Sequence, residues 1–134
     1  METEGIVSMD TNVLVRFLVE DKGAADQCRA AKELFTKRAV FIPESVLLET
    51  EWVLRAVYTV ARAEIHAAFT KLLGLGQVSV PDRSVLRQVL ACYAAGFDFA
   101  DAWHLIRSEG QEMKTFDKGF MKKARRAGHA ASSP

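Results

Sequence analysis

The feature that most constrains the fold of this chain is an alternation of short apolar runs with longer stretches of helical periodicity. Four apolar runs end at or just before a polar residue or proline, which predicts short buried strands. These runs are residues 5–9, 39–42, 77–80 and 113–116. Between and after them, apolar residues recur at helical spacing in a segment that follows residues 10–12 and in residues 21–38, 44–58, 62–73, 82–95, 98–108 and 118–127. Strands separated by one or two helices predict a parallel α/β sheet with helices on both faces.

Length and composition predict a single folded domain. The chain has 134 residues, of which 49% are hydrophobic, and this combination excludes a wholly disordered protein. No run of about 18 apolar residues predicts a membrane span, and Met1 to Gly5 lacks the pattern of a signal peptide. Cys28 and Cys92 lack the spacing of metal ligands, so we expect free thiols and a cytoplasmic location. Residues 129–134 are small and polar, and we expect a disordered tail after a domain that spans residues 1–128.

Two acidic residues stand at the ends of predicted strands. Asp10 follows the first apolar run and Asp117 ends the last. Asp10 is also explained as a helix N-cap, although Thr11 and Asn12 can serve the same purpose. Asp117 is also explained as a turn residue. Because ligands of parallel α/β sheets bind beyond the carboxyl ends of the strands, both residues are candidates for a functional site.

Two further acids lie on predicted helices. Glu49 shares an apolar stripe with Val46 and Val53, so its carboxylate is expected on a buried face, where it needs a partner such as a metal ion. Glu51, by contrast, has Arg55 four residues later, the favourable order for a surface ion pair. An ordinary buried or surface glutamate is an equally good interpretation of Glu49 on local grounds.

The fourth acid, Asp101, lies in the first turn of a predicted helix. Asp98 is expected to cap this helix, with Asp101 in the position of a capping box. The helix dipole favours an ionised carboxylate there. If Asp10, Glu49, Asp101 and Asp117 converge, their charges repel unless a hard cation is present. Carboxylate oxygens suit Mg²⁺ or Mn²⁺, and such a site suits phosphoryl chemistry.

Four motifs, in this order, resemble the PIN-domain ribonucleases, and within them the VapC-type toxins of bacterial toxin–antitoxin pairs. The motifs are MDTNVLVR at 9–16, IPESVLLETEWVLR at 42–55, GFDFADAWHL at 96–105 and TFDKGF at 115–120. The resemblance implies a three-layer α/β/α fold with a short central parallel sheet of four or five strands. Relatives often have a strand after the last acid, and the small, polar residues 127–134 depart from that pattern.

The resemblance also implies an activity and a site. It implies an endoribonuclease in which Asp10, Glu49, Asp101 and Asp117 hold one or two Mg²⁺ or Mn²⁺ ions and position a water that attacks an RNA phosphodiester. Thr11, Asn12 and Thr115 are expected to support the acids by hydrogen bonds, as is Asp98 from its capping position. The expected partners are RNA, including tRNA or rRNA, a VapB-type antitoxin that covers the groove, and a second copy of the chain in a homodimer.

The net charge of +1 conceals a local excess of basic residues. Residues 112–126 hold six basic residues against two acidic ones, a net charge of +4. A solvated helix face is the ordinary explanation, and a track for RNA phosphates is the alternative. Candidate RNA contacts are Arg16, Lys118, Lys122 and Lys123. Aromatic side chains can stack on bases, but helical spacing favours core or dimer packing for Trp52, Phe97, Phe99 and Trp103.

Other functional classes fit the sequence less well. A phosphoacceptor receiver domain needs paired acids after the first strand, and Asp10 has no acidic neighbour. A phosphatase with a DxD motif fails because residue 12 is Asn. The remaining alternative is a non-catalytic PIN-like module that binds RNA or a partner, and such a module is expected to have a degraded set of acids.

Overall fold

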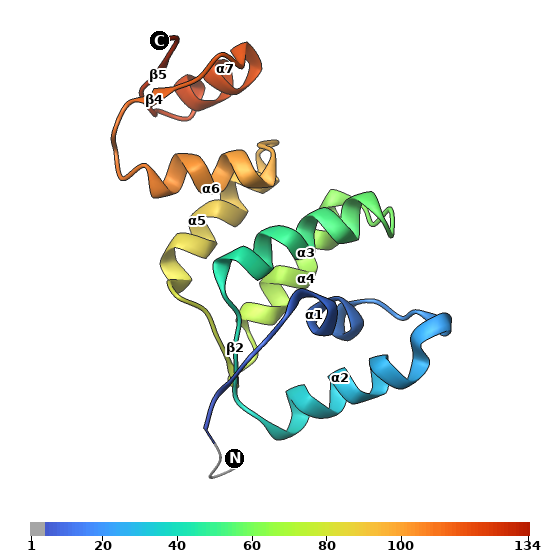
Figure 1. Ribbon diagram of the computed structural model, residues 1–134. Helices are drawn as coiled ribbons and strands as arrows, with labels where there is room; N and C mark the ends of the chain where they lie inside the picture. Colours follow the sequence, from blue (N-terminus) through green and yellow to red (C-terminus); the bar gives the residue numbers. More distant parts are fainter. Residues whose placement is uncertain (1–4) are drawn as a thin grey trace. The chain divides into compact units, whose positions relative to one another are not determined.

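The computed structural model describes residues 5–134, and the chain forms two compact units (Figure 1). The first unit ends at Arg83 and the second comprises Ser84–Pro134. Residues 1–4, where the sequence lacks a signal-peptide pattern, lie outside the described residues. Within residues 5–134, no helix is both long and apolar enough to cross a membrane.

The first unit is built on a three-stranded parallel sheet in the order β1-β2-β3. Its strands are β1 (Val7–Ser8), β2 (Val40–Phe41) and β3 (Val78–Ser79). The register aligns Val7 with Val40 and Val40 with Val78. The helices are α1 (Thr11–Leu18), α2 (Ala25–Lys37), α3 (Glu44–Ala56) and α4 (Arg62–Leu73), and a 3₁₀ turn, η1 (Lys22–Ala24), precedes α2. Parallel neighbours joined by helices are the connection that an α/β fold requires.

The core of the first unit contains apolar side chains from its helices and from β2. Leu14 of α1, Leu47 of α3 and Ile65 of α4 are fully buried. Helix α1 contacts both α2 and α3, and the Phe17 ring stacks on the Phe35 ring of α2 with centroids 3.7 Å apart. These contacts fix α1, and therefore the polar residues at its N-terminus, against α2 and α3.

The second unit has fewer elements and a smaller sheet. Its helices are α5 (Arg83–Ala94, which begins at the boundary), α6 (Phe99–Arg107) and α7 (Lys118–Arg126), and its strands are β4 (Met113–Lys114) and β5 (Ala131–Ser132). Strands β4 and β5 form a parallel pair. Phe99 meets Tyr93 and Trp103 edge to face, and Phe97 meets Phe120 in the same way. These aromatic contacts link α5 to α6, and link the segment between those two helices to α7.

The mixed α/β class with parallel strands, expected of a three-layer α/β/α fold, is confirmed, and all seven predicted helices are present among residues 5–134. The predicted sheet of four or five strands is wrong, because among the described residues the sheet has three strands, and β4 forms a second, two-stranded sheet with β5. The stretch 21–38 also begins later than expected as an α-helix. Asp21 accepts a hydrogen bond from the Gly23 N–H and starts the 3₁₀ turn instead.

The structure differs from the disordered tail expected over residues 129–134. Strand β5 lies within that segment and is held mainly by main-chain groups. The Met113 N–H donates to the Ala130 carbonyl, and the Thr115 N–H donates to the Ser132 carbonyl. The Arg125 Nε–H donates to the Ala131 carbonyl. Main-chain pairing does not depend on large apolar side chains, so the polar composition of the segment did not reveal it.

Candidate functional site

A cavity of about 410 Å³ in the first unit contains both acids that the sequence predicts there. Its wall combines charged, polar and apolar side chains. They are Asp10, Thr11, Asn12, Val15, Arg16, Glu49, Val53, Val57 and Tyr58. The first turns of α1 and the middle of α3 therefore supply the predicted acids, two predicted supporting residues and one predicted RNA contact to a single cavity.

Thr11 connects the two acids of this cavity. Asp10 is the N-cap of α1, and its Oδ1 accepts a hydrogen bond from the Thr11 N–H at 2.7 Å. The buried Thr11 hydroxyl donates to Glu49 Oε1 at 2.6 Å. Asp10 and Glu49 are themselves exposed. Each carboxylate thus accepts one short hydrogen bond and keeps further lone pairs open to the cavity.

The burial expected for Glu49 is wrong, and the roles of the two glutamates on α3 are exchanged. Glu49 is exposed, whereas Glu51 is only 3% exposed. Glu51 Oε2 accepts a hydrogen bond from Arg55 Nε at 2.8 Å. The buried face of α3 is formed by Leu47, Thr50, Glu51 and Leu54. This stripe lies beside the one that contains Val46 and Val53, and local spacing fits both stripes.

Arg16 lines the cavity, but its guanidinium is already engaged. Its Nε–H donates to Gln27 Oε1 at 2.8 Å and its Nη1 donates to the Tyr58 hydroxyl at 2.7 Å. The Tyr58 hydroxyl in turn donates to Asp21 Oδ2 at 2.9 Å. This hydrogen bond, the Gly23 N–H and the Arg16 charge lower the pKa of Asp21. Sequence reasoning missed Tyr58, Asp21 and Gln27, because their meeting depends on how α1, α2 and α3 pack.

In the second unit, the predicted acids lie at the N-termini of two helices. Asp98 caps α6 by accepting from the Asp101 N–H at 3.2 Å, as predicted. Asp117 caps α7 by accepting from the Phe120 N–H at 3.0 Å. The hydroxyl oxygen of Thr115, a predicted supporting residue, accepts from the Asp117 N–H at 3.0 Å. Thr115 and α7 thus hold the Asp117 backbone and one of its carboxylate oxygens.

Asp101 is the partly buried member of this unit's acidic cluster, which we define as Asp98, Asp101 and Asp117. Partial burial is the main cause that raises its pKa, and the charges of Asp98 and Asp117 raise it further. His104 and Lys123 offset part of this effect. Three carboxylates near enough to influence one another favour a bound cation on electrostatic grounds.

The predicted RNA contacts in the second unit differ in how they are held. Lys118, Lys122 and Lys123 are all exposed on α7, and the Lys123 ammonium donates to the Gly96 carbonyl at 2.8 Å. Among the aromatic candidates, the interpretation as core is confirmed for those of the second unit. Phe97, Phe99 and Trp103 are buried, whereas Trp52 of α3 is 54% exposed.

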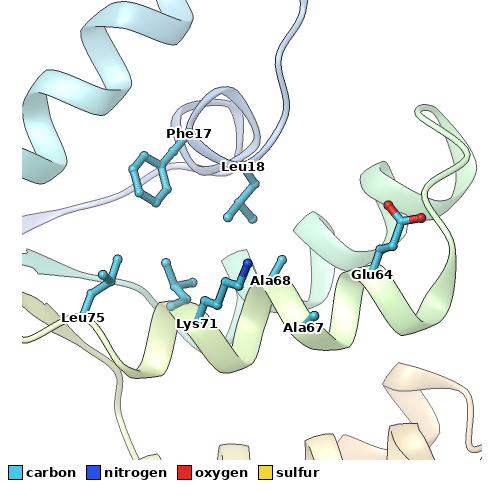
Figure 2. A pocket seen from close by; sticks show the side chains of 8 residues that line it. Phe17, Leu18, Glu64, Ala67, Ala68, Lys71 and Leu75 are labelled. Atoms are coloured by element: carbon cyan, nitrogen blue, oxygen red, sulfur yellow. The ribbon is translucent and has the colours of Figure 1, made fainter.

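A larger cavity of about 520 Å³ lies elsewhere in the first unit (Figure 2). It is bordered by Phe17 and Leu18 of α1 and by the Ala67–Ala68 face of α4, and its charged lining residues are Glu64 and Lys71. It contains none of the predicted acids. The smaller cavity is therefore the better candidate for metal-dependent chemistry.

The donor atoms that line the cavity of the first unit suit a hard divalent cation. Carboxylates, a hydroxyl and an amide are the oxygen ligands that Mg²⁺ and Mn²⁺ prefer. Across residues 5–134, no three His, Cys, Asp or Glu side chains are grouped so that they could hold a metal ion. The structure brings Asp10 together with Glu49, and separately brings Asp101 near Asp98 and Asp117.

Comparison with protein-family models identifies the family of the domain that contains these acids. The model of the PIN domain family matches residues 7–126. The chain belongs to the PIN domain family. PIN domains are generally nucleases that use divalent metals, which places this PIN domain among proteins that act on nucleic acids. No curated protein and no solved structure gives a significant match to the chain.

Proposed function

We propose that this PIN domain is an endoribonuclease that requires Mg²⁺ or Mn²⁺ and acts as a VapC-type toxin. The observation that carries the proposal is the cavity of the first unit, in which Asp10 and Glu49 face one space at the N-terminus of α1. The family match over residues 7–126 makes nucleic acid the expected substrate class. The preference for RNA rests on the resemblance of the four motifs to VapC-type toxins.

The proposal assigns the metal to four carboxylates, those of Asp10, Glu49, Asp101 and Asp117. When bound, the divalent ion would supply activation of water and neutralisation of the charge that develops on the phosphate. Thr11 supports this role, because its hydroxyl orients Glu49 and its N–H orients Asp10.

In the second unit, hydrogen bonds with main-chain N–H groups hold two of the acids in place. Asp98 and Asp117 each accept a main-chain N–H at a helix N-terminus, and Thr115 accepts the N–H of Asp117. Helix N-termini favour negative charge. A cation near Asp101 would favour its ionised form, since burial and the charges of Asp98 and Asp117 raise its pKa. Asn12 offers an amide oxygen to the cavity of the first unit.

The basic face of α7 is proposed as a second part of the RNA interface. Lys118 and Lys122 are exposed, so their ammonium groups are accessible to phosphates. Lys123 is a weaker candidate, because its ammonium already donates to the Gly96 carbonyl. A VapB-type antitoxin and a second copy of the chain are proposed as protein partners on the resemblance alone.

Cleavage of RNA by the purified chain tests the proposal. We expect total tRNA and rRNA to be cut in Mg²⁺ or Mn²⁺, with 5′-phosphate ends, and expect EDTA to stop the reaction. Asp26→Asn is a matched control, because Asp26 is a highly exposed acid of α2 that pairs with Arg29. If the chain binds RNA but does not cleave it in either metal, the proposed endoribonuclease activity is refuted and the non-catalytic PIN-like module is favoured. Coexpression with the product of an adjacent short reading frame tests the antitoxin.

A further inference from the structure

The Arg16 guanidinium is held by side chains from three segments of the chain, all within the first unit. Gln27 belongs to α2, Asp21 precedes η1, and Tyr58 follows α3. Two of the guanidinium's five N–H groups are used, one for Gln27 and one for Tyr58. Among residues 5–134, the Nη2 group donates to no acceptor. The side chain is 24% exposed and lines the cavity that contains Asp10 and Glu49.

Tyr58 lies between a cation and an anion. Its hydroxyl accepts from Arg16 Nη1 at 2.7 Å and donates to Asp21 Oδ2 at 2.9 Å, while Nη1 and Oδ2 are 3.7 Å apart. The hydroxyl therefore takes the place of a direct, close ion pair. A guanidinium in a close bidentate pair has fewer donors and less charge to offer another anion. Tyr58 thus leaves Arg16 available, whereas Asp21 competes for it.

We infer that Arg16 binds a phosphate of the RNA backbone next to the acids of the cavity, and that Tyr58 and Gln27 are positioning residues that hold it there. This inference rests on the proposed function. Two carboxylates alone repel a phosphate, and among residues 5–134 Arg16 is the one basic residue that lines this cavity. Within the described part of the chain, the two N–H groups on Nη2 remain free, and each can donate to a phosphate oxygen. Arg16 supplies binding, whereas the acids supply catalysis.

The inference predicts opposite effects for the two partners of the Tyr58 hydroxyl. Arg16→Gln removes the charge and should weaken RNA binding about tenfold, near the lower limit for a charge-assisted hydrogen bond. Tyr58→Phe should weaken it about threefold, because Arg16 then pairs directly with Asp21. Asp21→Asn should leave binding unchanged or strengthen it, because Arg16 loses its competing anion. If these three side chains only stabilise the fold, RNA binding should weaken in all three variants.

The test measures binding of a fluorescent 20-nucleotide single-stranded RNA to the full chain in EDTA, over a range of salt concentrations, together with kcat and KM in Mg²⁺. Arg16→Gln should lower the slope of log Kd against log salt by about 0.7, the value for one phosphate contact on a single strand. KM should rise more than kcat falls, and Arg16→Lys should restore part of the affinity. Arg29→Gln is the matched control, since Arg29 is an exposed arginine of α2 that pairs with Asp26.

Thermal unfolding of each variant separates the outcomes. If Arg16→Gln and Tyr58→Phe bind RNA as the parent does, with the same salt slope, the inference is refuted even where their melting temperatures fall. If Asp21→Asn weakens binding as much as Tyr58→Phe, the positioning role of Tyr58 is refuted. If the parent neither binds nor cleaves RNA, the proposed function fails together with the inference that rests on it.

Discussion

The two units of this PIN domain present carboxylates in two different electrostatic settings. In the first unit, Asp10 and Glu49 each accept a short hydrogen bond from Thr11, and Arg16 lies in the same cavity wall. In the second unit, Asp98 and Asp117 accept main-chain N–H groups at helix N-termini, while Asp101 is partly buried near both of their charges. The first pair is compensated by local donors, and the second group retains mutual repulsion.

This difference indicates where a divalent cation would change the molecule most. Hydrogen bonds from Thr11 already hold one carboxylate oxygen each of Asp10 and Glu49, so we expect their orientation to depend little on a metal. Repulsion in the acidic cluster of the second unit remains without one, and a cation there would relieve it. We therefore expect the acids of the two units to matter equally for catalysis but differently for stability.

The largest predicted effect is the loss of cleavage when one acid of either unit is neutralised. Asp10→Asn and Asp117→Asn should each slow RNA cleavage by about 10³-fold, the size expected for lost metal-dependent stabilisation of the transition state. Both asparagines can still accept the hydrogen bonds that start α1 and α7, so the folds should persist. Single-turnover cleavage in Mg²⁺ measures the rates, with circular dichroism as the check on folding.

The double variant shows whether the two acids act as one set. If they do, Asp10→Asn combined with Asp117→Asn should be no slower than either single variant, because groups that act together are not additive. Asp26→Asn should cleave at the parental rate. Multiplied losses would mean that the units contribute separately, and a parental rate for Asp117→Asn would remove the second unit from the chemistry.

The positions that the sequence predicted well are those fixed by neighbours a few residues away. Asp98 caps α6 because its side chain reaches the Asp101 N–H, three residues later. Asp117, which was expected as a turn residue or a metal ligand, also caps α7 through the Phe120 N–H, and this contact is equally local. Capping depends on local geometry, so a sequence pattern contains nearly all the information that it needs. The helices were predicted from the spacing of apolar residues, which is also local information.

The positions that the sequence did not predict depend on packing between distant segments. The Arg16 guanidinium meets Tyr58, 42 residues later, and Thr11 meets Glu49 at a separation of 38. The pairing of β4 with β5 depends on main-chain groups and is indifferent to side-chain polarity. The metal ligands as a set were expected from the resemblance alone, and their assembly stays a prediction.

Glu51, and not Glu49, is the buried glutamate of α3. Removing the charge of its partner Arg55 should have an effect of intermediate size. Arg55→Met keeps most of the apolar stem but removes the cation beside the buried Glu51 carboxylate. We expect the free energy of unfolding to fall by about 2 kcal/mol, less than for a fully buried pair because the Arg55 side chain is 39% exposed. Urea denaturation measures this loss, and the cleavage rate of the folded fraction should stay within about twofold of the parent.

Glu49→Gln is the counterpart, with the opposite pattern. Its side chain is exposed, so we expect a change in unfolding free energy within about 0.5 kcal/mol. Cleavage should fall by about 10²-fold or more, since one proposed metal ligand is neutralised. Should Glu49→Gln cleave normally and Arg55→Met lose activity while folded, the proposed roles of the two glutamates would be reversed.

The smallest predicted effect concerns Asp101 and depends on pH. Its pKa is raised by burial and by the neighbouring acids, so the folded protein keeps this proton to a higher pH than the unfolded chain does. The unfolded state therefore binds fewer protons within that window, and the contribution of Asp101 to stability falls as the pH rises through it. Below the ordinary pKa of 3.8 the destabilisation by Asp101 is absent, and above the raised pKa it is complete.

Asp101→Asn should thus stabilise the metal-free protein at neutral pH by about 0.5 kcal/mol, a modest value because solvent screens a partly exposed group. The gain in melting temperature over the parent should shrink toward zero on acidification and should also shrink when Mg²⁺ is added to the parent. A gain that is the same at pH 3 and pH 7 would show that repulsion is not its cause, and a loss at neutral pH would show that the helix dipole outweighs the acidic cluster.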